Sequence, residues 1–312
     1  MLSNALLLLA LAPLPQPSPG ASSALPEGAV PIRLPRDPRV APDGDSLAFT
    51  WRGDLWTASI EGGEATRMTI HPGEDRSPAF SPDGETLYFV SNRSGRDQIH
   101  AMPAAGGAAR QITHDSNPKT LLEATADGEG LLIRQGTDRG WHYSERDRLM
   151  IVPLDGDGPK RMLFDAGVRN GALSPDGQRA LFCRGRSNWN RKGYQGPQAM
   201  QLWHADLGGD APVMKRLDGD RERFQNVAAM DPMWGPDGEN VYFVSDPDGT
   251  FDVYAMNLAS GEVSRVTRVS DADGSDDGVT FPSMSADGRT LLYRRRFDLV
   301  AHDTRSGQSR DI

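Results

Sequence analysis

The stretch "NWNRKGYQG", residues 188–196, joins residue types that suit recognition chemistry. Trp189 and Tyr194 supply aromatic faces, and Arg191 and Lys192 place two cations beside them on a polar loop that contains glycine. Guanidinium and ammonium groups bind carboxylates, while aromatic rings cover apolar side chains. We therefore predict that these four residues contact a peptide or a protein partner. The alternative, in which the loop simply packs Trp189 against its own domain, stays open.

The sequence predicts no catalytic, cofactor-binding or metal-binding residue. It contains no G-x-S-x-G, no H-E-x-x-H and no phosphate-binding glycine loop. His142 and Tyr143 are the pair most typical of an active site, but spacing ties no nucleophile or carboxylate to them. Residues 271–278, "DADGSDDG", carry acidic or polar side chains at alternate positions, as a calcium-binding loop does. Pro282, however, stands at the last position of the loop, where calcium binding requires Glu. We interpret this segment as an acidic connector, and whether the chain is an enzyme stays open.

Composition indicates a turn-rich globular protein. The 312 residues include 34 Gly and 23 Pro, with 37% hydrophobic residues. A net charge of -9 argues against nucleic acid as a partner. The single cysteine, Cys183, excludes an intrachain disulfide, and its flanks predict a small buried side chain on a strand.

The N-terminal residues differ from the rest of the chain. An apolar run at residues 5–14, too short to span a bilayer, precedes a Pro/Ser/Gly segment with small residues suited to cleavage. We predict a signal peptide over residues 1–24, a leader or linker over 25–36, and a mature chain without a membrane span. Export to the periplasm or the extracellular space follows. Since residues 1–24 contain no Lys or Arg, a cytoplasmic location is the alternative.

One turn recurs six times along the chain. Each copy has the form Ser/Ala/Thr/Gly, Pro or Ala, Asp, Gly, and the six glycines are Gly44, Gly84, Gly128, Gly177, Gly238 and Gly288. Proline and aspartate favour turn conformations, and glycine accepts the positive φ that closes a hairpin. Successive glycines are 40, 44, 49, 61 and 50 residues apart, which is the period of a four-stranded propeller blade rather than of a helical repeat.

Two strand signals follow every copy of this turn. Segments such as "TLYFVS" and "NVYFVS" come first, and segments such as "QIHAMP" and "DVYAMN" come second, before a further glycine turn and a short polar strand. We predict an all-β fold, a six-bladed β-propeller of four-stranded antiparallel blades over residues 37–312. We expect it to close by packing between blades, with residues 29–35, "AVPIRLP", as an alternative edge strand.

The units resemble the PD40 form of the WD40-like repeat found in TolB and in tricorn-type proteases. The segment "RSPAFSPDGETLYFVSNRSGRDQIHAMPAAGGAARQIT" fits that repeat almost throughout. The markers "DLWTASIEGGEATRMT", "NWNRKGYQG" and "TFPSMSADGRTLLYRRRFDLVAHDT" look most like the N-terminal six-bladed propeller of tricorn-type serine proteases. The family's loop reads Trp-Lys-Gly-Tyr-x-Gly-Gly. Here Asn190 and Arg191 separate Trp189 from Lys192, and Pro197 replaces the second glycine.

The resemblance implies a non-catalytic module that channels peptides or binds proteins. In that family a second propeller, a PDZ domain and a serine-peptidase region follow, so the expected partner is a protease subunit or a C-terminal protease region. We predict no cofactor. Two alternatives stay open: a stand-alone exported TolB-like protein-binding scaffold, and a propeller enzyme with its active site at a mouth of the channel.

Overall fold

The computed structural model describes residues 29–137, 147–154, 158–187, 189–217, 224, 227–269 and 278–312. The chain divides into two units, Met1–Pro31 and Ile32–Ile312, and the described strands all belong to the second. Among the described residues, no helix has the length and apolar character needed to cross a membrane. The predicted signal peptide, His142, Tyr143 and residues 271–277 of the acidic connector lie outside the described residues.

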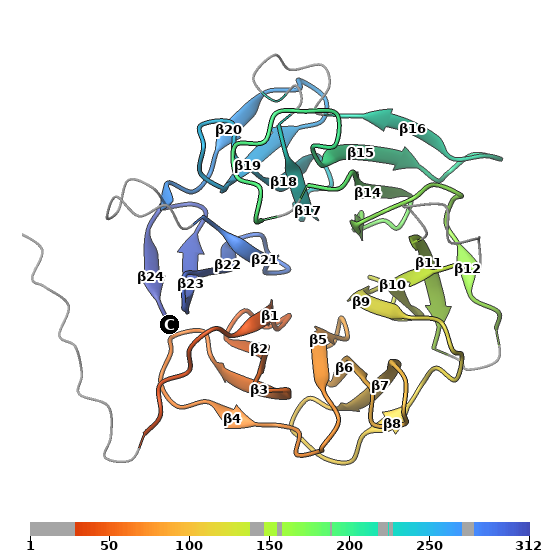
Figure 1. Cartoon of the computed structure of the whole chain (residues 1–312), viewed down its shortest axis with the longest axis vertical. Helices are drawn as coiled ribbons and strands as arrows, with labels where there is room; N and C mark the ends of the chain where they lie inside the picture. Colours follow the sequence, from red (N-terminus) through yellow and green to blue (C-terminus); the bar gives the residue numbers. More distant parts are fainter. Residues whose placement is uncertain are drawn as a thin grey trace, which may run out of the picture. The chain divides into compact units, whose positions relative to one another are not determined.

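The described residues form six four-stranded sheets, which we number as blades in chain order (Figure 1). Blades 1 and 2 consist of β1 (Arg36–Val40), β2 (Ser46–Trp51), β3 (Asp54–Ser59), β4 (Thr66–Arg67), β5 (Asp75–Phe80), β6 (Thr86–Ser91), β7 (Gln98–Pro103) and β8 (Arg110–Gln111). Blades 3 and 4 consist of β9 (Lys119–Ala124), β10 (Gly130–Gly136), β11 (Asp147–Pro153), β12 (Arg161–Met162), β13 (Asn170–Leu173), β14 (Arg179–Arg184), β15 (Gln201–Asp206) and β16 (Val213–Arg216). Blades 5 and 6 consist of β17 (Ala229–Trp234), β18 (Asn240–Ser245), β19 (Asp252–Asn257), β20 (Val263–Arg265), β21 (Thr280–Met284), β22 (Thr290–Arg295), β23 (Asp298–Asp303) and β24 (Ser309–Asp311).

Each blade is an antiparallel meander whose strands pair in sequence order. The first strands of successive blades contact one another in a ring, β1–β5–β9–β13–β17–β21, and β21 returns to β1. Figure 1 shows the labelled first strands β1, β5, β9, β17 and β21 nearest the centre, with the fourth strands outermost. This arrangement confirms the prediction of a six-bladed propeller with four antiparallel strands per blade.

All six Asp-Gly turns join the first strand of a blade to its second. Their glycines have φ between +65° and +77°. In the turn of blade 2, the Asp83 carboxylate accepts hydrogen bonds from the Ser81 hydroxyl (2.5 Å) and from the backbone N–H of Glu85 (3.0 Å). The same bonds lower the pKa of Asp83 below its usual value. The equivalent aspartates accept the corresponding backbone bond at 2.9–3.0 Å, so the turn chemistry expected from the sequence is confirmed.

We expect Gly84→Val to lower the free energy of unfolding by about 1 kcal/mol or more, since a branched side chain resists positive φ. Gly84 has φ +75°, and an added Cβ would lie 3.6 Å from Pro42. The matched control is Gly209→Val, at an exposed glycine without positive φ. Urea unfolding of both variants measures the difference. Equal midpoints for Gly84→Val and the parent chain would contradict the turn assignment.

The hydrophobic core lies between the blades. Buried side chains of blades 1 and 2 form one cluster, those of blades 2 and 3 a second, those of blades 3 and 4 a third, and those of blades 4, 5 and 6 a fourth. A last cluster joins blade 6 to blade 1, with Leu47 and Leu292 fully buried in it. Cys183 lies on β14 and is buried, as its flanks predicted. Apolar contact therefore continues around the entire ring.

The ring closes between blades 6 and 1 by packing of one sheet against the other. No strand is shared between them, because each blade contains four consecutive strands of its own. Residues 32–35 form no strand, and the Leu34 N–H donates to the Phe297 carbonyl at 2.7 Å. Arg310 pairs with Glu61 at 2.6 Å. Ile312 approaches Gly62, whose added Cβ would lie 3.7 Å from it. Of the two expectations for closure, packing is thus the one observed.

A polar clasp fastens the third strand of several blades to the outer strand. In blade 5, the Asp252 carboxylate accepts from Arg265 Nη2 (2.5 Å), from the Thr267 hydroxyl (2.7 Å) and from the Val269 N–H (3.0 Å). The Val253 N–H donates in turn to the Thr267 hydroxyl oxygen at 2.9 Å. Blade 1 repeats the clasp with Asp54, Arg67 and Thr69. Because Asp252 is fully buried, these donors take the place of water at its carboxylate.

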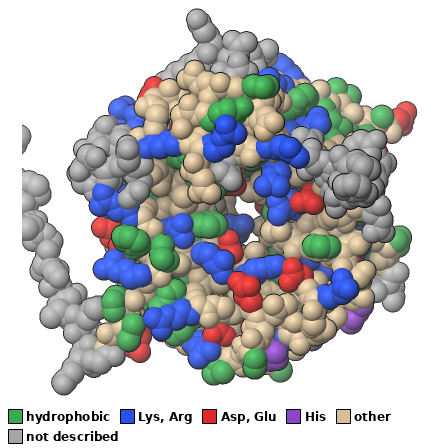
Figure 2. Space-filling model, in the orientation of Figure 1, with side chains coloured by type: hydrophobic (Ala, Val, Ile, Leu, Met, Phe, Trp, Pro, Cys, Tyr) green, Lys and Arg blue, Asp and Glu red, His purple; other side chains and the backbone are tan. Residues whose placement is uncertain are grey.

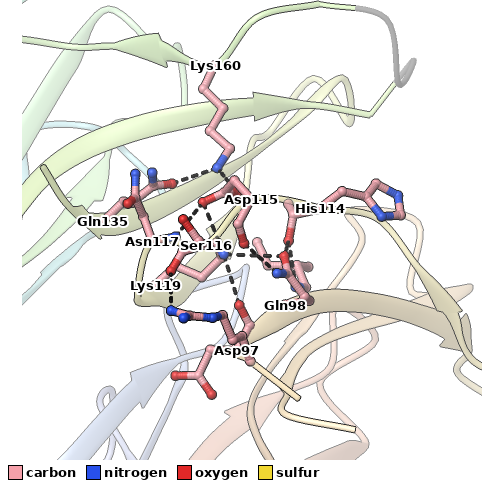
Figure 3. A network of polar contacts seen from close by, with 12 residues as sticks. Asp97, Gln98, His114, Asp115, Ser116, Asn117, Lys119, Gln135 and Lys160 are labelled. Carbon is pink, nitrogen blue, oxygen red and sulfur yellow. Dashed lines mark hydrogen bonds and ion pairs between the residues drawn. The ribbon is translucent and has the colours of Figure 1, made fainter. Parts of the chain in front are cut away.

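Blade 2 carries a different clasp that extends to blade 3 and holds the start of β9 (Figure 3). The buried Lys119 ammonium donates to the Asp97 carbonyl at 2.9 Å and to the Gln98 amide oxygen at 3.3 Å. It also lies 3.4 Å from Asp115, which Lys160 contacts from blade 3. Burial lowers the pKa of Lys119 below its usual value, and Asp115 opposes that shift. The network fixes the inner strand of blade 3, and with it the channel wall.

Candidate functional site: the central channel

A cavity of about 620 Å³ runs along the six innermost strands. In each of these strands the lining begins within the first three residues and continues to the proline or alanine of the Asp-Gly turn. Figure 2 shows the centre of this view hollowed, with Lys and Arg side chains gathered around the opening and a few Asp and Glu side chains among them. The repeated turn therefore builds a channel whose wall takes one strand from every blade.

Four of the inner strands place a left-handed residue directly before a proline. Asp37, Ser77, Asp231 and Phe281 have φ between +45° and +53°, and each lies within a register shift of the first strand against the second. Such a conformation costs about 1–3 kcal/mol for a residue other than glycine. All four residues line the cavity. Strain repeated at equivalent places of a channel wall marks this wall as the candidate site.

The described lining contains three arginines and three carboxylates. The arginines are Arg39, Arg134 and Arg169, and the carboxylates are Asp37, Glu123 and Asp231. Arg134 is fully engaged: its guanidinium donates to the Arg169 carbonyl at 2.6 Å and to the Thr120 hydroxyl at 3.0 Å, and lies 3.2 Å from Asp147.

Arg39 bridges from blade 1 to blade 3 inside the channel. Its Nη2 donates to the Leu122 carbonyl at 3.3 Å, and its Nη1 donates to the Pro38 carbonyl at the same distance. Blade 2 stands between blades 1 and 3 in the ring, so this side chain passes along the lumen rather than to a neighbouring strand. Both bonds are long and their acceptors are neutral. The guanidinium is therefore held weakly.

Burial raises the pKa of two channel carboxyls. It raises the pKa of Glu123 to about 7, against the opposing effects of a hydrogen bond from the Leu173 N–H (2.6 Å) and of the nearby Arg39 charge. It also raises the pKa of Asp231, which accepts a bond from the Asn170 side-chain amide at 2.6 Å. Each carboxyl thus relies mainly on one neutral donor, and Glu123 changes its charge near neutral pH.

The loop singled out from the sequence contributes one residue to this channel. Trp189 lines the cavity and packs edge-on against Phe251 of blade 5, with ring centroids 5.2 Å apart. The loop joins β14 to β15, so it lies at the mouth where the inner strands begin. Trp189 therefore lies at that mouth and also packs against the propeller, which leaves both interpretations of the loop open.

The other loop residues contact one another or blade 5. The Arg191 guanidinium stacks over the Tyr194 ring at 3.9 Å. The Gly193 N–H donates to the buried Asp246 carboxylate at 2.5 Å. Burial raises the pKa of Asp246, while the Lys192 charge opposes that shift. The contact of Trp189, Arg191, Lys192 and Tyr194 with a peptide or partner stays a prediction.

Sequence reasoning missed the charged wall of the channel. A sequence signal for this wall was present in the first strands of blades 1, 2, 5 and 6, which read "RDPRV", "DRSPAF", "AMDPMW" and "TFPSM". In each of them a proline follows the residue that adopts positive φ. A proline at the same place of four repeat units indicates a bulge rather than a regular strand. The residue before that proline could have been singled out as a channel residue on this ground.

The fold and channel define a six-bladed β-propeller whose central cavity is lined by both charged and apolar residues. The family model for the tricorn protease N-terminal beta propeller domain matches residues 32–308, and the chain belongs to this family. Tricorn protease homolog 1 of Streptomyces coelicolor is 29% identical over 269 residues, which cover 85% of this chain and 23% of that protein. The chain therefore spans less than a quarter of that curated relative.

Solved structures agree on the fold. The crystal structure of the tricorn protease superposes with a TM-score of 0.70 at 20% identity and covers 90% of this chain, which corresponds to 26% of that chain. TolB from Acinetobacter baumannii superposes with a TM-score of 0.64 at 18% identity, covering 86% of this chain and 63% of that one. At these identities the likeness concerns the fold alone.

Proposed function

We propose that this chain is a non-catalytic propeller module that binds peptides in its central channel and passes them to or from a tricorn-like serine protease. The cavity of about 620 Å³, bounded by all six blades and lined by both charged and apolar side chains, carries the proposal. Membership of the tricorn N-terminal propeller family supports a protease domain or subunit as the partner. From residues 1–24 we further propose export to the periplasm or the extracellular space.

The loop at the channel mouth suits the first contact with a peptide. Trp189 offers an aromatic wall at the cavity, and Arg191 stacked on Tyr194 presents a cation on an exposed surface. Cations there meet carboxylates of the peptide, and the rings cover its apolar side chains. The double variant Arg191→Ala, Tyr194→Ala should therefore weaken binding, and unchanged binding would make the loop merely structural.

Narrowing the channel tests the proposal directly. Ser77→Phe adds a ring to the lining at φ +53°, a backbone conformation that Phe281 already adopts at the equivalent place of blade 6. We expect the variant to bind short unstructured peptides at least about tenfold more weakly, or ~1.4 kcal/mol, in fluorescence anisotropy. The control is Ser94→Phe in an exposed turn. Absence of peptide binding, or equal affinity of Ser77→Phe and the parent chain, would overturn the proposal.

A further inference from the structure

Two of the three lining arginines have no carboxylate partner among the described residues. Arg39 donates only to backbone carbonyl oxygens, at 3.3 Å. The Arg169 side chain is exposed and has no hydrogen bond or ion pair within the described part of the chain. Its backbone carbonyl, by contrast, is used by Arg134. Two guanidiniums thus lie in the channel with donor capacity to spare.

The acids of the channel do not neutralise these arginines at every pH. Glu123 and Asp231 face Arg39, and Asp231 also faces Arg134 and Asp37. Guanidinium stays charged throughout the physiological range, whereas a desolvated carboxyl takes up a proton first. Since burial raises the pKa of Glu123 to about 7, the balance of charge in the channel becomes more positive as pH falls from 8 to 6.

The surroundings strengthen this local charge. The whole chain carries a net charge of -9, yet basic side chains surround the central opening in Figure 2. A channel with low-dielectric walls focuses the field of the charges that line it. The described lining holds three arginines and three carboxylates, so once Glu123 takes up a proton an anion in the lumen meets a wall whose net charge is opposite to that of the protein as a whole.

We propose that Arg39 and Arg169 form a carboxylate-binding site inside the channel, which makes the module select peptides with acidic side chains over basic ones. This inference rests on the proposed function, because it specifies the cargo of the same channel. Arg39 is the specificity-determining residue, since its weak bonds to two carbonyls can be exchanged for a bidentate bond to a carboxylate. Arg169 supplies a second guanidinium at the channel wall.

The test measures affinity for three peptides that differ only in charge. Acetylated, amidated pentapeptides with a neutral fluorophore carry two Asp, two Ser or two Lys, and each is titrated with the full chain. We expect the acidic peptide to bind at least about tenfold more tightly than the neutral one, and the basic peptide to bind most weakly. A neutral peptide with a free carboxyl terminus shows whether a terminal carboxylate binds as well as a side-chain carboxylate.

Substitutions assign the effect to the channel. Arg39→Gln and Arg169→Gln should each reduce the acidic preference several-fold, and Arg52→Gln, an exposed arginine stacked on Trp51 outside the channel, should not change it. Because the Arg169 side chain makes no described contact, this variant remains informative even if Arg39→Gln fails to fold.

The pH dependence supplies an independent readout. For the parent chain, affinity for the acidic peptide should rise from pH 8 to pH 6, because Glu123 loses its negative charge beside Arg39. Glu123→Gln should lose most of this pH dependence and bind at both pH values with about the affinity of the parent chain at pH 6. A pH dependence that persists unchanged in this variant contradicts the role of Glu123 and with it the proposed balance of charges.

The outcomes separate this inference from the function on which it rests. If no peptide of any charge binds, both proposals fail. If all three peptides bind with equal affinity, or the acidic preference survives Arg39→Gln, Arg169→Gln in the double variant, the channel binds peptides but the carboxylate site is wrong. An acidic preference lost in that double variant and kept in Arg52→Gln supports the site.

Discussion

Arg265→Met will lower the free energy of unfolding by about 3–5 kcal/mol, the usual cost of leaving a buried charge without its partner. Arg265 donates through Nε and Nη2 to Asp252 Oδ2, at 3.2 and 2.5 Å. The Asp252 side chain is fully buried and the Arg265 side chain is 17% exposed. Methionine keeps the aliphatic part of the arginine, so the loss reflects charge more than volume. Chemical unfolding followed by tryptophan fluorescence measures it.

The matched control is Arg310→Met, which removes an arginine of another outer strand. Arg310 pairs with Glu61 at 2.6 Å, but the two side chains are 41% and 76% exposed. Exposed pairs contribute about 0–1 kcal/mol, so this variant should stay within that range. If both variants unfold at the same denaturant concentration, burial of the Asp252 carboxylate does not govern the stability of the clasp.

The purified chain will hydrolyse no peptide. Hydrolysis needs a nucleophile, a base within hydrogen-bond reach and an oxyanion site. A serine nucleophile needs a histidine within hydrogen-bond distance. Within the described residues, the serine hydroxyl that meets this condition is that of Ser309, which lies 2.9 Å from His302 Nδ1. This pair lies on β24 and β23, the outer strands of blade 6, and neither residue lines the central channel. Burial also lowers the pKa of His302.

Fluorogenic peptides and a serine-directed phosphonate probe test this expectation. Added trypsin serves as the positive control for both readouts. We expect neither fluorescence release nor labelling by the chain alone. If the chain does hydrolyse peptides, and Ser309→Ala or another single Ser→Ala substitution abolishes this turnover, the chain is an enzyme. That result would favour the alternative of a propeller enzyme with its active site at a mouth of the channel.

The fold could be predicted because the residues that determine its turns lie close together in the sequence. Each Asp-Gly turn depends on a carboxylate and a glycine within a few residues, and four of the six add a hydroxyl, as Ser81, Asp83 and Gly84 show. Repetition of that unit at blade-like spacing then determined the number of blades. The clasp formed by Asp252, Arg265 and Thr267 is nearly as local, and its Arg-x-Thr pattern recurs in blade 1.

The site could be predicted only in part, because its contacts connect distant residues. Arg39 reaches a carbonyl 83 positions away, and Asn170 reaches Asp231 across 61 positions. Sequence patterns identified the loop that contains Trp189, and Trp189 is the described residue of this loop that lines the channel. They did not show that Glu123 would be desolvated, since burial inside the ring exists only after six blades have assembled.

Contact between blades 6 and 1 costs more conformational entropy than contact between other neighbouring blades, because it joins the two ends of the propeller sequence. Arg310 and Glu61 lie 249 positions apart, whereas contacts within a blade close loops of about a dozen residues. Each doubling of a closed loop costs about 0.6 kcal/mol, so closing this junction requires roughly 2–3 kcal/mol more than pairing two adjacent strands. An exposed ion pair supplies at most about 1 kcal/mol. A fully buried leucine such as Leu47 or Leu292 contributes about 1.5–3 kcal/mol. The buried apolar cluster between blades 6 and 1 therefore holds the ring of blades closed.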